Sequence, residues 1–314
     1  MTRGSTMLRS SLLVFLAGAC YGGMAPVVKM AYEQGFDWAQ TTVGQTVFAA
    51  ILFAVACMIQ RARGICWVGA SGIQHAKLIL TGVMSGLTTV FYSIALATLP
   101  VAVALTLLFQ FTWMGIVAQA IITRRPPRWW ETLAAAVVVA GTLLASGLAP
   151  GNPEVSYDLA GMAFALASAV TYTLFVVFSS SAAAQMPSMQ RGFEICGGAL
   201  VVAVAVAVVM CPSFLVSGEV LRQAPFGFTQ GMFALFLPVL LFGWGGPALP
   251  AGVVSVLASS ELPTSIVLSY LILGEAVSPF QVLGVALILA GVVVSQYPAL
   301  TALRAPRADS AAGA

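Results

Sequence analysis

Two glutamates stand inside the apolar stretch of residues 258–275, where a carboxylate could do chemistry. Glu261 precedes Leu262-Pro263, and Glu275 follows Gly274. A charged side chain near the centre of a membrane-spanning helix costs about 2.5–3.5 kcal/mol on insertion scales, so it usually has a function. A carboxyl group at that depth could carry a coupling proton or pair with a cationic group of a substrate. The alternative is a structural role, in which Glu261 caps the segment that follows Pro263.

The composition indicates an integral membrane protein. Apolar residues make up 60% of the 314 residues and charged residues 7%, against about 45–50% and 25% in a soluble domain. The formal charge of +3 is small and dispersed, so no nucleic acid partner is expected. The five cysteines lack metal-ligand spacing and are expected to be reduced and structural. No metal and no cofactor are predicted.

Apolar segments of the length that crosses a bilayer recur along the whole chain. A helix needs about 20 apolar residues to span a hydrocarbon core of roughly 30 Å. Prolines in Leu99-Pro100 and Leu249-Pro250 separate neighbouring segments, because proline ends or starts a helix. The sequence predicts an all-α, polytopic fold of ten transmembrane helices, at 11–32, 39–59, 76–97, 99–122, 129–148, 158–180, 193–211, 230–249, 251–273 and 279–298.

The basic residues set the predicted orientation. When ten spans alternate from an inside N-terminus, 11 of the 13 lysines and arginines fall at cytoplasmic ends, the exceptions being Lys29 and Arg222. The positive-inside rule then places both termini in the cytoplasm. The lipid bilayer is the predicted environment, and a multi-pass protein of a bacterial inner membrane is the expected localisation.

An internal repeat divides the chain. An ungapped offset of 150 residues aligns Leu99-Pro100 with Leu249-Pro250, and Ala140-Gly141 with Ala290-Gly291. Each half holds five predicted spans, an odd number, so the second half must be inverted in the membrane. The expected units are two five-helix repeats, residues 1–150 and 151–298, and a disordered cytoplasmic tail, residues 299–314.

Further candidate residues for a substrate site lie inside the predicted spans. Ser265 is one turn after Glu261 on the same helical face. Gln110 and Trp113 form an i, i+3 pair that offers one polar and one aromatic group to a small amphipathic substrate. For all three, the alternative is packing or hydrogen bonding between helices.

Three aromatic residues with a polar atom complete the predicted site. Tyr21 and Tyr172 occupy similar places in the first helix of each half, and Trp244 lies in a glycine- and proline-rich stretch expected to bend. Such side chains need a hydrogen-bond partner when they are buried. Each could equally serve packing alone.

Two charged residues keep open roles. Lys29 could contact Glu33 at i, i+4 or bind a substrate carboxylate. Glu194 is expected to pair with Arg191 at i, i+3, as a structural contact.

Several motifs resemble the EamA-like branch of the drug/metabolite transporter superfamily. The closest similarity covers about residues 247–296, and fair similarity covers helix 1 and the segment around residues 95–102. Its motifs are Glu261-Leu262-Pro263, Gly274-Glu275, Ser278-Pro279, Gly284 through Gly291-Val292, and Tyr21-Gly22-Gly23-Met24-Ala25-Pro26-Val27-Val28-Lys29. The resemblance implies ten helices in two repeats and movement of small metabolites, often export of amino acids or related compounds. The first half departs from the family pattern at Thr112, Arg124-Arg125 and Gln45.

A secondary transporter is therefore the expected function, with alternating access to a cavity at the membrane midplane and Glu261 as the candidate coupling-ion residue. It is expected to export a small-molecule substrate such as an amino acid, and proton coupling is one alternative for its driving force. A non-transporting scaffold or receptor is the second hypothesis. An intramembrane enzyme is the third, suggested by Gly69-Ala70-Ser71-Gly72 with His75 nearby, but the single histidine lies in the same predicted loop. Substrate identity and oligomeric state stay open.

Overall fold

The described part of the chain is helical throughout. The computed structural model describes residues 3–64, 67–99, 101–145, 158–214, 217–274 and 277–297, and within these ranges there is no strand. Glu275, Pro100 and the tail at 299–314 lie outside the described residues. The helices of the first half are α1 (Arg3–Gly22), α2 (Met24–Glu33), α3 (Trp38–Ala62), α4 (Gly72–Thr98), α5 (Val101–Leu108), α6 (Phe111–Thr123) and α7 (Trp129–Ala145).

The second half continues with the same kinds of element. Two short turns in it have π-helical geometry, η1 and η3, and one, η2, is a 3₁₀ turn. Its elements are α8 (Leu159–Ser181), α9 (Ser188–Met210), α10 (Glu219–Arg222), α11 (Ala224–Gly231), η1 (Met232–Phe236), α12 (Leu237–Gly245), η2 (Gly246–Ala248), α13 (Ala251–Ala258), α14 (Glu261–Leu268), η3 (Ser269–Leu273) and α15 (Pro279–Ser295).

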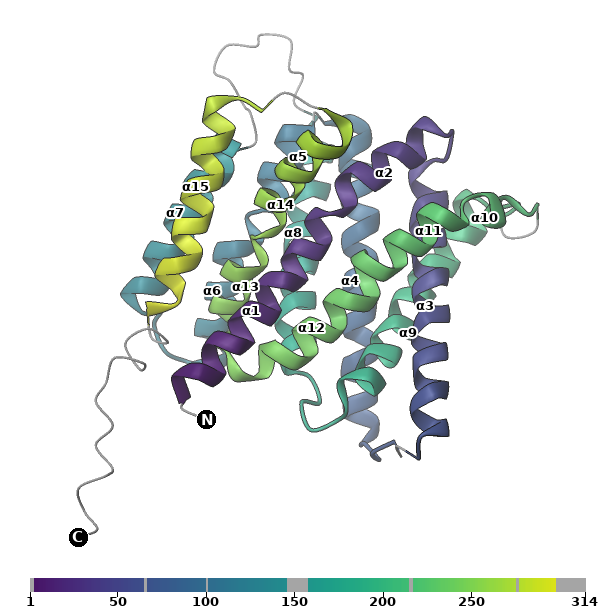
Figure 1. Ribbon diagram of the computed structural model, residues 1–314, viewed down its shortest axis with the longest axis horizontal. Coiled ribbons are helices and arrows are strands. Elements are labelled where there is room, and N and C mark those ends of the chain that lie inside the picture. Colours follow the sequence, from purple (N-terminus) through teal and green to yellow (C-terminus); the bar gives the residue numbers. More distant parts are fainter. Residues whose placement is uncertain are drawn as a thin grey trace.

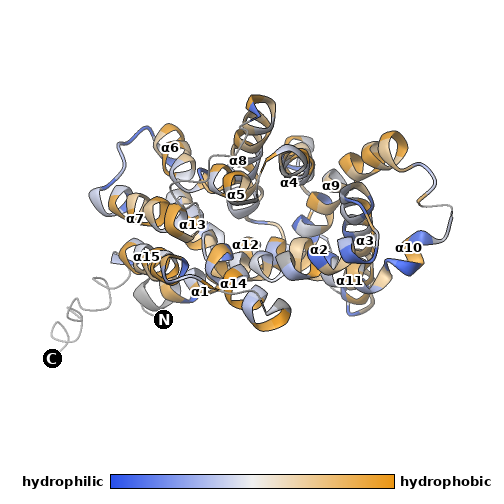
Figure 2. Cartoon of the chain, turned by 90° about the horizontal axis from the view of Figure 1, so that it is seen from above, coloured by the Kyte–Doolittle hydropathy of each residue, from blue (hydrophilic) through white to orange (hydrophobic). Residues whose placement is uncertain are grey.

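Eight helical stretches in the described ranges are long and apolar enough to cross a membrane. Several combine adjoining elements, as α13 and α14 do in Ala251–Ile272. The helices α7 and α15 are apolar but have 17 residues each, at the lower limit of about 17–25 for a crossing. Residues of high hydropathy are spread over most of the helices (Figure 2). The protein is thus an all-helical, multi-pass membrane protein.

The helix boundaries repeat with the predicted offset. Adding 150 to the bounds of α7 gives those of α15, since 129 + 150 = 279 and 145 + 150 = 295. Adding 150 to the bounds of α5 gives those of α13, and adding 150 to the first residue of α3 gives the first residue of α9. Two repeats built from equivalent helices therefore make up the fold.

The contact between α7 and α15 (Figure 1) shows how the two repeats are related. A side chain added at Gly141 would meet α15, and one added at Gly291, its equivalent, would meet α7. A Cβ atom at Gly141 would lie within 3.0 Å of atoms of Gly284 and Ile288. A Cβ atom at Gly291 would lie within 3.0 Å of atoms of Ala134 and Val138. These two pairs are themselves 150 residues apart, so the contact is reciprocal, as a two-fold axis requires. Equivalent helices that pack antiparallel in this way have opposite directions in the membrane.

Each repeat also breaks one span at the same place. The first break falls at Phe109-Gln110, between α5 and α6, and the second at Ser259-Ser260, between α13 and α14. In the second repeat, Pro263 lies in the first turn of α14, where a helix tolerates a residue without an N–H group. Because proline has no N–H, Pro263 cannot donate a hydrogen bond back across the break. The second break makes Glu261 the first residue of a helix.

Candidate functional site

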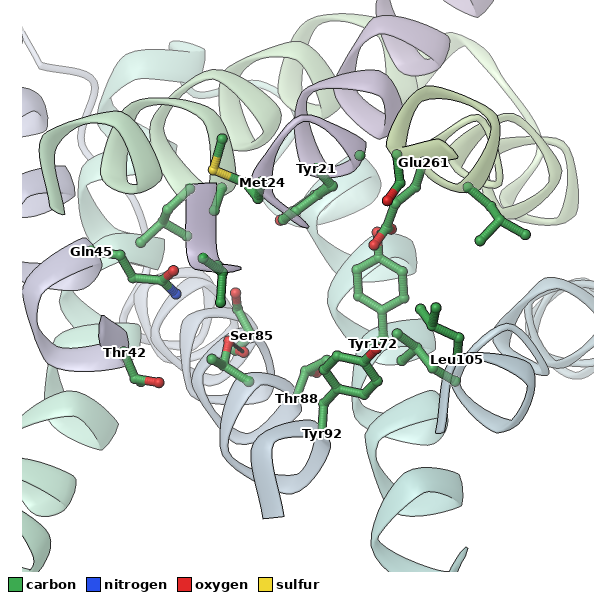
Figure 3. A pocket seen from close by; sticks show the side chains of 18 of the residues that line it. Tyr21, Met24, Thr42, Gln45, Ser85, Thr88, Tyr92, Leu105, Tyr172 and Glu261 are labelled. Carbon is green, nitrogen blue, oxygen red and sulfur yellow. Dashed lines mark hydrogen bonds between the residues drawn. The ribbon is translucent and has the colours of Figure 1, made fainter. Parts of the chain in front are cut away.

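A cavity of ≈ 790 Å³ lies between the two repeats. Figure 3 shows side chains from several helices around it, with the Tyr172 hydroxyl pointing toward Glu261. The polar side chains of its wall come from α1 to α4, α8, α14, η3 and α15. They are Tyr21, Lys29, Tyr32, Thr42, Gln45, Thr46, Ser85, Thr88, Thr89, Tyr92, Tyr172, Glu261, Ser265, Ser269 and Gln281.

Among the described residues that line this cavity, Glu261 is the one acidic residue. The Tyr172 hydroxyl donates a hydrogen bond to Glu261 Oε2 over 3.1 Å. The Tyr172 ring is 5% exposed and meets the ring of Tyr21 edge-on, with 5.9 Å between centroids. Phe111 contacts the same ring at 4.7 Å. Tyr172 is therefore held by two rings, so that its hydroxyl stays directed at the carboxylate.

The repeat places an apolar residue where a second carboxylate could have stood. Phe111 is the first residue of α6 and Glu261 the first residue of α14, 150 positions later. Phe111 is fully buried. The two repeats thus contribute different chemistry at equivalent positions.

Hydroxyl groups hold the break that precedes Glu261. Ser260 Oγ donates to the carbonyl of Phe15 in α1 over 2.7 Å. Ser259 Oγ and Thr112 Oγ1, a residue of α6, are 2.9 Å apart and share a hydrogen bond. These bonds fix the start of α14 to two helices of the first repeat, α1 and α6, which positions the Glu261 side chain.

Close packing of α1 on this break depends on Gly22. A Cβ at position 22 would overlap the backbone carbonyl oxygen of Glu261 and lie 2.8 Å from Thr264 Cβ. We expect Gly22→Ala to move α14 away from α1 and to lower the melting temperature, since overpacking typically costs about 1–3 kcal/mol. Gly35→Ala would be a poor control because Gly35 has a positive φ of 86°.

Gly69→Ala is the matched control for Gly22→Ala, because nothing lies within 4 Å of a Cβ added at Gly69 and its φ is not positive. The two melting temperatures can be compared in one detergent by following tryptophan fluorescence. Equal values for Gly22→Ala and the wild type would contradict the contact described for α1 and α14.

The structure brings four of the seven site residues proposed from sequence to the cavity: Tyr21, Tyr172, Glu261 and Ser265. Gln110, Trp113 and Trp244 are absent from its wall. Trp113 is 42% exposed and its indole N–H donates to Gln110 Oε1 over 2.8 Å, while Gln110 Nε2 donates to the Thr106 carbonyl. Trp244 is 54% exposed. Trp113 and Trp244 thus belong to the outer surface, and Gln110 is half-buried beside Trp113.

Two polar stripes of the cavity wall were not among the predicted site residues. On α4 the stripe is Ser85, Thr88, Thr89 and Tyr92, with spacings of three, four and seven residues from Ser85. Thr42, Gln45 and Thr46 repeat this pattern on α3. Residues spaced in this way share one helical face. A polar face on an otherwise apolar span was the sequence signal that could have found them.

Three further charged residues are Lys29, Glu194 and Arg191. Lys29 lines the cavity near Tyr32. Glu194 pairs with His75, Oε2 to Nδ1, over 2.7 Å, so the expected pair of Glu194 with Arg191 is wrong. Arg191 is buried and instead donates to the carbonyls of Ser179 and Gly243, because its side chain points into the bundle.

The enzyme hypothesis finds no support in the arrangement of its two residues. Ser71 Oγ accepts from the backbone N–H of Gln74 and caps α4. His75 is bound to Glu194, as above. In the described ranges no group of three or more histidine, cysteine, aspartate or glutamate side chains could hold a metal ion. Cys20, Cys57, Cys196 and Cys211 are free thiols, and Cys66 lies outside the described residues.

Comparisons with known proteins agree with this architecture. The sequence matches none of the curated proteins. One crystal structure, described only as that of a protein, superposes with a TM-score of 0.70 at 19% sequence identity, covering 93% of this chain and 99% of the other. This likeness concerns the fold alone. The profile of the EamA-like transporter family matches twice, at residues 8–147 and 159–297. The chain therefore belongs to the EamA-like transporter family.

Proposed function

We propose that the protein is a secondary transporter that carries a small metabolite through the cavity between its repeats. The observation that supports this most is the Glu261 carboxylate on the wall of a ≈ 790 Å³ cavity, hydrogen-bonded to Tyr172. Inverted repeats with a polar site at their interface are a common transporter plan.

The proposed orientation has ten crossings and both termini in the cytoplasm. The first turn of α1 and the last turn of α15 lie at the same end of the bundle (Figure 1). The loops after α3 and α6 reach this end too, and they carry Arg61, Arg63, Arg124, Arg125 and Arg128. We call it the basic end, and the positive-inside rule supports a cytoplasmic location for it. A bacterial inner membrane fits this arrangement.

Polar contacts join the two repeats at the basic end. Gln119 Oε1 accepts from the backbone N–H of Gly252 over 2.6 Å, and Gln119 Nε2 donates to Glu131 Oε1 over 3.0 Å. These bonds, which we call the Gln119 clasp, join α6 and α7 to α13 of the other repeat. Gln119 and Glu131 correspond to Ser269 and Gln281, 150 residues later in the chain. Ser269 and Gln281 line the Glu261 cavity instead of forming such a contact. This difference supports a state that is closed at the basic end, and alternating access would exchange the two arrangements.

The cavity wall favours a substrate with an ammonium group. Glu261 supplies a carboxylate, and Tyr21, Tyr92 and Tyr172 supply aromatic rings around it. Carboxylates and aromatic rings both attract cations. Hydroxyl and amide groups of α3 and α4 can bind further polar atoms. An amino acid or a related amine is the proposed substrate, export is the proposed direction, and Glu261 is the site at which a coupling proton would compete with it.

Transport into proteoliposomes tests the proposal. Purified protein is reconstituted and offered labelled amino acids, amines, nucleosides and sugars, with and without a pH gradient. We expect saturable movement of at least one ammonium compound, faster than in protein-free liposomes. Movement of no compound in the panel would overturn the transporter proposal. Saturable binding without movement would favour the receptor hypothesis instead.

A further inference from the structure

A second cavity, of ≈ 1190 Å³, opens at the basic end of the molecule. Its wall is formed by the ends of α6, α8 and α15, by the starts of α1, α7 and α13, and by the η2 turn. Its charged and aromatic lining residues are Arg125, Arg128, Trp130 and Glu131. This cavity shares no lining residue with the Glu261 cavity.

The charge of the second cavity is positive. Arg125, Arg128 and Glu131 are its charged lining residues. Glu131 is 4% exposed, and both of its oxygens accept hydrogen bonds, Oε1 from Gln119 and Oε2 from the backbone N–H of Arg128. Within the described ranges neither arginine side chain is paired with a carboxylate; the pair found there joins His75 and Glu194. Two guanidinium groups thus face the cavity without a neutralising partner.

One of these guanidinium groups is held in place. Arg128 Cζ lies 5.1 Å from the centroid of the Trp130 ring, a cation–π contact. A guanidinium fixed in this way is preorganised to bind two oxygens of one anion. Arginine pairs phosphate groups with two parallel hydrogen bonds, which adds geometric selectivity to the charge.

The backbone before these arginines is strained. Arg124 has a φ of 52°, in the left-handed region, whereas its equivalent in the other repeat is Gly274, with a φ of 68°. Glycine adopts this conformation freely, but another residue pays roughly 1–2 kcal/mol. The first repeat therefore carries Arg124-Arg125 where the geometry favours glycine. Backbone strain of this kind is concentrated at functional sites and ligand clamps.

The surroundings place the cavity mouth at the level of lipid headgroups. Ile121 and Ile122, in the last turn of α6, are 71% and 62% exposed, as expected for contact with acyl chains. The rings of Trp129 and Trp130 meet edge-on, and both contact the tilted ring of Tyr297, with centroids 5.5 to 5.8 Å apart. Aromatic groups of this kind collect at the membrane interface. A ligand can therefore reach the arginines from the headgroup layer as well as from water.

We propose that the second cavity binds a phosphate group through Arg125 and Arg128. The phosphate could belong to the headgroup of an anionic lipid or to a soluble compound, and the experiment below separates these sources. The site is independent of substrate binding at Glu261, so either proposal can fail alone.

The test is the melting temperature of the purified protein, measured with phosphatidylcholine, with phosphatidylglycerol, and with inorganic phosphate. A ligand that binds the folded state raises the melting temperature. We expect phosphatidylglycerol to raise it by a few degrees over phosphatidylcholine, and Arg125→Gln/Arg128→Gln to lose this rise. If inorganic phosphate also raises the melting temperature, and this rise also requires the two arginines, the bound phosphate belongs to a soluble compound. If only phosphatidylglycerol raises the melting temperature, the bound phosphate belongs to a lipid headgroup.

Arg61→Gln/Arg63→Gln is the matched control, because it removes two exposed arginines from the basic end that do not line the cavity. It should keep the full response. Arg125→Lys/Arg128→Lys retains the charge without the bidentate geometry and should show a reduced one. The proposal is overturned if neither ligand raises the melting temperature, or if Arg125→Gln/Arg128→Gln shows the same rise as the wild type. It is also overturned if Arg61→Gln/Arg63→Gln loses as much of the rise as Arg125→Gln/Arg128→Gln does.

Discussion

Glu261→Gln is expected to lower the transport rate about ten- to a hundred-fold. The substitution keeps the size of the side chain and removes its charge and its capacity to bind a proton. Hydrogen bonds to charged groups contribute about 1.5–3 kcal/mol, and each 1.36 kcal/mol is a tenfold change in rate. Initial rates between pH 5.5 and 8 in proteoliposomes measure the effect. If the Glu261 carboxyl carries the coupling proton, the variant should also lose the pH dependence that the wild type shows.

Two further variants make this result specific. Glu33→Gln removes an exposed carboxylate of α2 that does not line the cavity, and it should transport normally. Glu261→Asp keeps the charge but shortens the reach to Tyr172, so it should retain part of the activity. A Glu261→Gln variant with the rate and the pH profile of the wild type would remove this residue from the mechanism.

The second large effect is expected at the Gln119 clasp. Gln119→Leu leaves the Gly252 N–H and Glu131 Oε1 without their partners. Each unsatisfied buried group costs about 1–3 kcal/mol, a cost borne by the state that is closed at the basic end. The population should therefore shift toward the opposite state, since each 1.4 kcal/mol changes the ratio of states about tenfold.

Thiol labelling from the basic end reports this shift. Ser255 is fully buried in α13, which begins next to Gly252 of the clasp and ends at the break before Glu261. Ser255→Cys can be introduced after the natural cysteines have been replaced. Labelling by a membrane-impermeant reagent should be faster with Gln119→Leu than without it. Gln34→Leu, at an exposed position, is the control and should leave the rate unchanged. Equal labelling in all three proteins would show that the clasp does not hold this end closed.

Much of the architecture was predictable because it depends on period and composition. The offset of 150 that was found in Leu-Pro and Ala-Gly pairs reappears in the bounds of α7 and α15. The family resemblance is confirmed by the two matched repeats. The count of ten crossings stays a prediction, since α7 and α15 are shorter than the eight long candidates.

The site was harder to predict because sequence spacing gives a shared face but not its direction. Gln110 and Trp113 do contact each other, as their spacing indicated. They point outward because the break at Phe109-Gln110 directs Phe111 and Thr112, both fully buried, toward the interior. The partner of Glu194 was equally hidden, since His75 lies 119 residues away in the chain.

The difference between Phe111 and Glu261 at equivalent positions limits the stoichiometry of the proposed cycle. A symmetric pair of carboxylates could exchange two protons, whereas the described cavity wall supplies one. For an amine that carries one net positive charge, a cycle that works through Glu261 then exchanges one proton for one substrate cation and moves no net charge across the bilayer. With such an exchange, a gradient of one pH unit sustains about a tenfold ratio of substrate concentrations, and the membrane potential neither helps nor opposes accumulation.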